Sequence, residues 1–282
     1  MLLHRYFGSH AFETLKEVKL KTSKLSSFND PFEFLFRATG NMTAKKAREY
    51  FLGRRHNPDF LQTASQFIPG LLTDKRANKI LDKKIPQLTA VMVANFDKYK
   101  NMSLDNRIIT TDKFLRVICF SDAKVEPLDE ILIWSHYAKK HEGVRIGFEI
   151  PDGITNPFKM FKIKYQKERH EVDFSNGFSD EAVGQVLIDS AKVKSLAWRY
   201  ENEYRLLTSP RFCEERTMPD STVEHFLDFK REWVKSIDFG VRCSQTEIQR
   251  IHHLIKTNYP KNVVCRKAAF HKSEFALEYK EI

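Results

Sequence analysis

The sequence predicts an α+β fold with a mixed, mostly antiparallel split sheet, flanking helices and a helical insertion. Short apolar or alternating runs typical of strands are mixed with helical segments, and no regular strand–helix–strand rhythm of a parallel sheet recurs. Of the 282 residues, 41% are hydrophobic and 30% are charged, which excludes a disordered chain. This length allows one large domain or two small ones, and we expect a single α+β domain over residues 1–282.

The N-terminal part of the chain predicts strands followed by a long helical segment. Residues 2–7 favour a strand, residues 10–17 a short helix, and residues 19–23 an edge strand, because their polarity alternates. Residues 26–33 form a turn cluster. Apolar residues then recur at spacings of three and four over residues 43–105, which predicts a basic helical insertion or lid within the domain.

Strands and helices are mixed in the rest of the chain. The near-continuous apolar run 115–120 indicates a central strand. Pro127, followed by Asp129 and Glu130, marks the start of a helix that carries Trp134 and ends before Gly143. We further expect strands at 144–150, 159–165, 200–207, 234–239, 263–264 and 268–279, and helices at 179–195 and 246–257.

Charge and cysteine content limit the classes of partner. The net charge of +10 and the pI of about 9.3 suit a polyanion, although the basic residues are scattered and form no concentrated arm. No cysteine pair has C-x-x-C spacing and the histidines are dispersed, so we expect no metal site and a reducing, cytoplasmic environment. No stretch approaches the roughly 20 apolar residues that a membrane helix needs, so we expect no membrane partner.

Two segments carry more chemistry than an ordinary core does. Glu201 and Glu203 are two positions apart, so on a strand both carboxylates point to one face, which Arg205 shares. Such a pair can orient a sugar hydroxyl and stabilise a developing cation, or it can belong to an edge strand with cross-strand ion pairs.

The second segment is helical and contains Trp134, Ser135, His136 and Tyr137. Trp134 and Tyr137 share a helix face and can form an aromatic wall for a flat ring, and His136 can bond a ligand or transfer a proton. The same residues also fit a half-buried amphipathic helix with satisfied polar tips. No G-x-S-x-G elbow surrounds any serine, which argues against a hydrolase triad.

A nucleotide site would have to do without a phosphate loop. The glycines never form G-x-G-x-x-G or G-x-x-x-x-G-K, so arginine and backbone groups must hold any nucleotide. Asn29 and Asp30, which precede Pro31, carry side chains suited to ribose or amide groups, or they form a structural Asx-turn.

Together these segments resemble a widespread, largely bacterial family known as domain of unknown function 2971. The resemblance covers the whole chain except the basic helical segment. The matching pieces are His4-Arg5-Tyr6, residues 28–33, Cys119-Phe120-Ser121, residues 134–138 with His141 and Gly143, Lys194 with Trp198, residues 200–205 and residues 237–240.

The order of these motifs is in turn similar to that of ADP-ribosyltransferase folds. The first-strand group would be His4 or Arg5 and the late glutamate pair would be Glu201 and Glu203, whereas the usual Ser-Thr-Ser motif is absent. The resemblance implies a NAD-consuming transferase or glycohydrolase, with a role in phage defence or as a toxin, and a nucleic acid or a protein as acceptor.

This resemblance implies a role for each site residue. Glu203, with Glu201 beside it, would stabilise the ribose cation and bind its 2′-hydroxyl. Tyr137 or Trp134 would stack on nicotinamide, and Arg5 and Arg205 would pair with the diphosphate. Asn29 and His136 would orient the substrate or accept a proton. The remaining nucleotide-binding candidates are His4, Tyr6, Asp30 and Ser135.

Two alternatives remain open from the sequence. The first is a non-catalytic, nucleic-acid-binding defence component in which the basic segment 45–100 contacts the polyanion. The second is a hydrolase or nuclease that uses His136 with Glu203.

Overall fold

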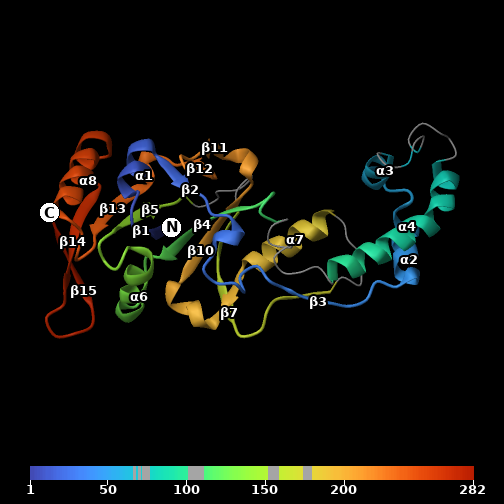
Figure 1. The fold of residues 1–282 in the computed structure, drawn as a ribbon, viewed down its shortest axis with the longest axis horizontal. Coiled ribbons are helices and arrows are strands. Elements are labelled where there is room, and N and C mark those ends of the chain that lie inside the picture. The colour runs from blue at the N-terminus through green and yellow to red at the C-terminus, as the bar shows by residue number, and fades with distance from the viewer. Residues whose placement is uncertain (66–67, 69–70, 72–76, 101–110, 152–158, 174–179) are drawn as a thin grey trace. The chain divides into compact units, whose positions relative to one another are not determined.

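A computed structural model describes the chain from residue 1 to residue 282, apart from 66–67, 69–70, 72–76, 101–110, 152–158 and 174–179 (Figure 1). The chain divides into two compact units. Unit 1 consists of Met1–Phe34, Ile108–Glu168 and Ala191–Ile282, and unit 2 of Leu35–Arg107 and Arg169–Ser190. The expectation of a single domain with an insertion or lid at 43–105 stays a prediction.

Unit 1 is built on an eight-stranded sheet in the order β15-β14-β13-β5-β1-β4-β10-β6. Every neighbouring pair in this sheet is antiparallel except β13 with β14, so the predicted mixed, mostly antiparallel α+β architecture is confirmed. The strands are β1 Leu2–Phe7, β4 Arg116–Asp122, β5 Val144–Glu149, β6 Lys159–Lys162, β10 Glu203–Thr208, β13 Val234–Phe239, β14 Val264–Phe270 and β15 Leu277–Glu281.

The sheet splits between β1 and β4. These two strands pair only where Leu3 faces Asp122 and His4 faces Ser121, whereas β1 pairs with β5 along its whole length. Beyond His4 the strands diverge, and Val117 of β4 forms an antiparallel bridge with Ser23 instead. Side chains can therefore enter the space that opens between β1 and β4.

One face of the sheet carries the main apolar core. Side chains alternate along each strand, so Leu3, Ile146 and Ile237 from adjacent strands point to the same face. Helices α1 (Ala11–Glu17) and α8 (Gln245–Asn258) cover this face, with Leu15 and Ile251 fully buried (Figure 1). Each such side chain contributes about 1.5–3 kcal/mol of burial free energy.

The opposite face is polar and carries helix α6 (Pro127–Tyr137). Arg145 on β5 bonds Glu130 of α6 and, at 2.8 Å, Asp238 on β13. The indole N–H of Trp134 donates to the Tyr279 hydroxyl over 2.9 Å, and the Tyr279 hydroxyl donates to Glu130 over 2.7 Å. Ion pairs and directed hydrogen bonds therefore fasten α6 to the sheet.

Smaller elements complete unit 1. One sheet joins β2 (Lys19–Lys21), β12 (Val223–Asp228) and β11 (Glu214–Thr217), and β7 (Lys164–Gln166) pairs in parallel with β9 (Val193–Ser195). The short 3-10 helices are η1 Leu25–Ser27, η3 Leu196–Glu201, η4 Pro210–Phe212 and η5 Arg231–Trp233.

Unit 2 is mainly helical among its described residues. It contains α2 (Ala44–Arg54), α3 (Pro58–Ser65), α4 (Ala77–Lys100) and most of α7 (Asp180–Ala191), with β3 (Arg37–Thr39) parallel to β8 (Glu171–Asp173). Helices α2 to α4 fall where the apolar periodicity predicts helix. The rest of the predicted helical segment 43–105 lies largely outside the described residues, at 66–76 and 101–105. Among the helices that the structure describes, none has the length and apolar character that a membrane crossing requires.

Several predicted elements differ from the observed ones. Residues 193–195, predicted as the end of a helix, form β9, and β11 and β12 were not predicted. Residues 200–202 were predicted to begin a strand, but Glu201 ends η3 and Asn202 adopts a left-handed conformation with φ of 43°. The predicted strand 268–279 is divided between β14 and β15.

Candidate functional site

Unit 1 contains a cavity of about 320 Å³ at the split in its sheet. Arg5 and Tyr6 of β1 and Cys119 and Phe120 of β4 line it, just beyond the last pairs of these two strands. The complete lining is His4, Arg5, Tyr6, Ser23, Ser27, Phe28, Asn29, Cys119, Phe120, Ser121, Ile133, Tyr137, Lys194, Glu201 and Glu203.

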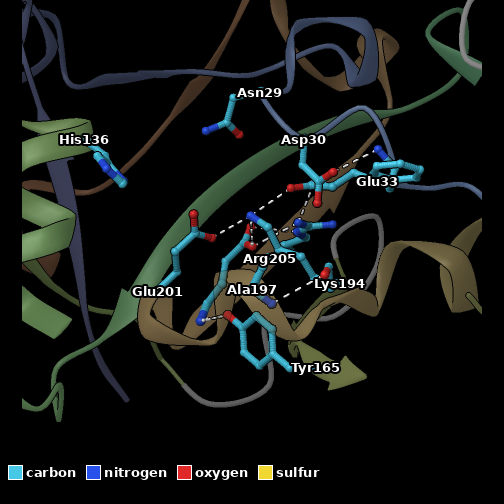
Figure 2. Close-up of polar contacts among 12 residues, drawn as sticks. Asn29, Asp30, Glu33, His136, Tyr165, Lys194, Ala197, Glu201 and Arg205 are labelled. Carbon is cyan, nitrogen blue, oxygen red and sulfur yellow. Dashed lines mark hydrogen bonds and ion pairs between the residues drawn. The ribbon is translucent and has the colours of Figure 1, made fainter. Parts of the chain in front are cut away.

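A buried charge cluster adjoins this cavity. It consists of the carboxylates of Glu33, Glu201 and Glu203 and the cations of Lys194 and Arg205, and each residue is at most 5% exposed. Figure 2 shows the Lys194 ammonium between Glu33 and Glu201. With three carboxylates and two cations, the cluster carries one net negative charge when every group is ionised.

Arg205 donates hydrogen bonds to both carboxylate oxygens of Glu203. Its Nε donates to Glu203 Oε1 over 2.7 Å and its Nη2 donates to Oε2 over 2.9 Å, while Nη2 also bonds Glu33 over 2.6 Å. Burial opposes the ionisation of Glu203, but the charge and hydrogen bonds of Arg205, helped by Lys194, outweigh it and lower the Glu203 pKa to about 2. Glu203 is therefore an ionised carboxylate with both oxygens engaged.

Lys194 on β9 is the centre of the cluster. Its Nζ lies 2.5 Å from Glu201, 2.8 Å from Glu33 and 3.3 Å from Glu203. Burial disfavours the ammonium, but these carboxylates outweigh that effect and raise the Lys194 pKa above its ordinary value. Burial raises the pKa values of Glu33 and Glu201, and the nearby Glu203 charge adds to this shift.

Tyr137 links the cluster to the wall of the cavity. Located at the end of α6, it donates its hydroxyl hydrogen to Glu201 Oε1 and accepts a 3.3 Å hydrogen bond from the Asn29 amide. Burial, followed by the Glu201 charge, raises the pKa of Tyr137, so the phenol stays protonated. Glu201 Oε1 is thus the cluster oxygen that faces a hydroxyl donor in the cavity wall.

Arg5 supplies a cation at another part of the cavity wall. Its Nη2 donates to the Lys21 carbonyl over 2.9 Å, and its Nη1 has no hydrogen-bond partner among the described residues. Removal from water lowers the pKa of Arg5 to about 10, so the guanidinium stays charged at neutral pH. Burial, with Arg145 and Arg266 nearby, lowers the pKa of His4 to about 3 and keeps that imidazole neutral.

The structure brings together seven of the twelve site residues that the sequence predicts. Four separate parts of the chain supply them to the cavity lining. They are His4, Arg5, Tyr6, Asn29, Tyr137, Glu201 and Glu203.

The other five predicted site residues do not line the cavity. Trp134 is fully buried against Tyr6, at a ring separation of 5.3 Å, and Arg205 is fully buried in the charge cluster. Asp30 is buried and accepts from the Phe32 backbone N–H over 2.9 Å, as in the Asx-turn alternative.

Ser135 and His136 lie on α6 and bond groups outside the charge cluster. The Ser135 hydroxyl donates to the Ile131 carbonyl over 2.8 Å and lies 3.1 Å from His141 Nε2. His136 Nδ1 lies 2.8 Å from the Tyr200 hydroxyl, and Figure 2 shows His136 apart from the carboxylates. The structure therefore does not join His136 to Glu203.

Two central residues of the site were missed as site candidates. Lys194 and Glu33 both appear among the matching pieces of the family resemblance, but neither was given a role. Glu33 is the one charged residue in the run Phe32–Phe36, and this signal could have identified it. Lys194, which has Lys192 two positions before it, carries no comparable signal. Among the described residues, no group of three or more His, Cys, Asp or Glu is placed to hold a metal ion.

Comparison with known proteins gives one result that bears on this site. Searches of curated proteins and of solved structures give no match to the chain. The family model described as "Protein of unknown function (DUF2971)" matches residues 133–206, a span that contains Tyr137, Lys194, Glu201, Glu203 and Arg205. Over the segment that supplies most of the charge cluster, the chain is therefore similar to this family, as its sequence motifs suggest.

Proposed function

We propose that the cavity in unit 1 binds NAD as a substrate and that the protein cleaves the bond between nicotinamide and ribose, transferring ADP-ribose to an acceptor or to water. The observation that carries the proposal is the hydrogen-bonded series Asn29–Tyr137–Glu201–Lys194, which connects the cavity wall to a buried carboxylate cluster.

The charge of the cluster suits this reaction. The nicotinamide ring of NAD is a cation, and cleavage of its glycosidic bond moves positive charge onto the ribose. A preorganised negative environment out of water stabilises such charge far more than water does. With every group ionised, the one net negative charge of Glu33, Glu201, Glu203, Lys194 and Arg205 supplies that environment.

Within the cluster, we assign the contact with the ribose to Glu201 rather than to Glu203. Both oxygens of Glu203 are engaged by Arg205, so Glu203 acts on the substrate through its negative charge and not through direct contact. Glu201 Oε1 instead accepts from a single hydroxyl, that of Tyr137, and a ribose hydroxyl can bond the same oxygen.

Arg5 and the rings of the cavity complete the proposed substrate site. The Nη1 group of Arg5 has bonding capacity left and can donate to a phosphate oxygen, while Nη2 keeps the Lys21 carbonyl. Tyr137, Phe28 and Phe120 offer rings to the nicotinamide, and we leave Trp134 and Arg205 out of the substrate site because both are fully buried.

We also propose that the fold of unit 1 is ADP-ribosyltransferase-like. The support is a split antiparallel sheet with His4 and Arg5 on its first strand and Glu203 on a later strand next to β4.

The test is nicotinamide release from NAD by the purified chain, with Glu201→Gln compared with Glu142→Gln. Glu142 is a half-exposed surface residue paired with Lys139, so its amide variant controls for the loss of a carboxylate as such. We expect Glu201→Gln to lose about 100-fold or more of the turnover and Glu142→Gln to keep it. Full activity of Glu201→Gln, or neither release nor a NAD-induced thermal shift in the parent protein, would contradict the proposal.

A further inference from the structure

The helical segment of unit 2 carries most of the excess positive charge of the chain. Residues 43–100 contain 12 basic and 5 acidic residues, against a net charge of +10 for the whole protein. None of these residues lines the cavity, because every residue that lines it belongs to unit 1.

The structure places these cations on solvent-facing positions of two helices that pack together. Ala47 of α2 and Phe96 of α4 are buried in one apolar cluster, so the opposite sides of the helices face solvent. Six cations on α2 and α4 are exposed: Lys45, Lys46, Arg48, Lys79, Lys83 and Lys84.

None of these six cations forms an ion pair with a carboxylate of a described residue. Glu49 and Asp82 lie one helical turn from Lys45 and Lys79, yet the structure contains neither pair. In unit 1, by contrast, Lys21 faces a carboxylate at 2.9 Å. The charge on α2 and α4 is therefore not neutralised by the described part of the protein.

The surroundings of these cations favour a nucleic-acid backbone over a lipid surface. A helix that binds a membrane surface presents large apolar side chains beside its cations. Among the described residues of α2 and α4, the exposed large apolar residue is Val91, and α2 has none. Phosphate groups of a nucleic acid need only closely spaced cations, because release of their counterions drives binding.

We propose that the exposed cations of α2 and α4 form a binding surface for the phosphate backbone of nucleic acid, without sequence preference. Lys45, Lys46 and Arg48 form its densest part, since they fall within four consecutive positions. The proposal does not rest on NAD turnover, and either can fail alone.

The experiment is a fluorescence anisotropy titration of a labelled, mixed-sequence DNA duplex with the full chain between about 50 and about 200 mM salt. The test variant combines Lys45→Gln, Lys46→Gln and Arg48→Gln. The control combines Lys261→Gln, Lys272→Gln and Lys280→Gln, which removes the same charge from exposed positions of unit 1. Vesicles containing phosphatidylserine are titrated in parallel.

We expect the parent protein to bind the duplex with a steep dependence on salt. The α2 variant should bind at least about 10-fold more weakly than the parent protein. The slope of its log affinity against log salt concentration should be smaller in magnitude by about 2 to 3, whereas the control variant should change little in both quantities. Equal losses in the two variants would assign binding to net charge alone and overturn the proposal. Absence of duplex binding, or tighter binding to the vesicles than to the duplex, would overturn it as well.

Discussion

Replacing Lys194 with Met tests the central role of this side chain in the charge cluster of unit 1. Methionine keeps most of the length of the side chain but removes a cation that contacts three carboxylates at 2.5, 2.8 and 3.3 Å. Loss of one partner of a buried ion pair costs about 3–5 kcal/mol. We expect about 5 kcal/mol because three carboxylates lose a cation that they share, although Glu33 and Glu203 keep Arg205. The free energy of unfolding of a domain is about 5–15 kcal/mol, so the variant should be barely stable at neutral pH.

The cost should depend on pH in a defined direction. The pKa values of Glu33 and Glu201 already lie above 4.5 in the folded protein, and loss of the Lys194 charge raises them further. A carboxyl with a raised folded pKa stabilises the fold below its unfolded pKa, and this contribution is lost as pH rises through the folded pKa. The variant should therefore lose more stability at pH 8 than at pH 5. The difference is about 1.4 kcal/mol for each unit by which the pKa of one carboxyl is raised.

Urea denaturation followed by tryptophan fluorescence measures both effects. The three tryptophans, Trp134, Trp198 and Trp233, all belong to unit 1, so the signal reports the unit that contains the cluster. Lys235→Met is the control, because it removes a surface cation 3.1 Å from Glu149 and should cost less than about 1 kcal/mol. A Lys194→Met protein within about 1 kcal/mol of the parent at pH 8, or equally destabilised at pH 5 and pH 8, would refute the reasoning.

Three further variants test other features of unit 1. Gly143→Ala should cost about 1–3 kcal/mol or more, because its Cβ would lie 2.0 Å from the Phe7 carbonyl oxygen; an unchanged melting temperature would contradict this. His4 has a pKa of about 3 against 6.5 ordinarily, so its stabilising effect is lost as pH falls below 6.5; His4→Gln should reduce the difference between urea midpoints at pH 7 and pH 5, and an unchanged difference would argue against burial of a neutral ring. Tyr137→Phe keeps the ring but removes the donor to Glu201; NAD turnover should fall about 10-fold with little change in KM, and an unaltered kcat would remove Tyr137 from the proposed mechanism.

The sequence predicts the fold best where local pattern and pairing agree. The bounds of β1 and β13 match the predicted strands 2–7 and 234–239, whereas β11, Glu214–Thr217, is so polar that only its pairing with β12 makes it a strand. Val193–Ser195 continues a helical pattern but pairs with Lys164–Gln166. Short strands of this kind depend on partners distant in the chain, which periodicity does not reveal.

Prediction of the candidate site was limited by the same dependence on distant partners. Glu201 and Tyr137 carry recognisable chemistry, and the structure brings them into contact. Arg205 also looks like a ligand-binding residue in isolation, but Glu33, 172 positions earlier in the chain, binds it in the interior. An isolated motif shows which groups a side chain can bond; only the fold decides which partner it has.

The attachment of α6 has a consequence for how accurately Tyr137 is positioned. A helix seated on a smooth apolar surface can slide or rotate with little change in buried area. Here a slide by one turn would separate Glu130 from Arg145 and Trp134 from Tyr279 at the same time. The charged face of the sheet thus sets the position of α6 along the strands. It thereby holds the Tyr137 phenol, at the end of the helix, within hydrogen-bonding distance of the Glu201 carboxylate.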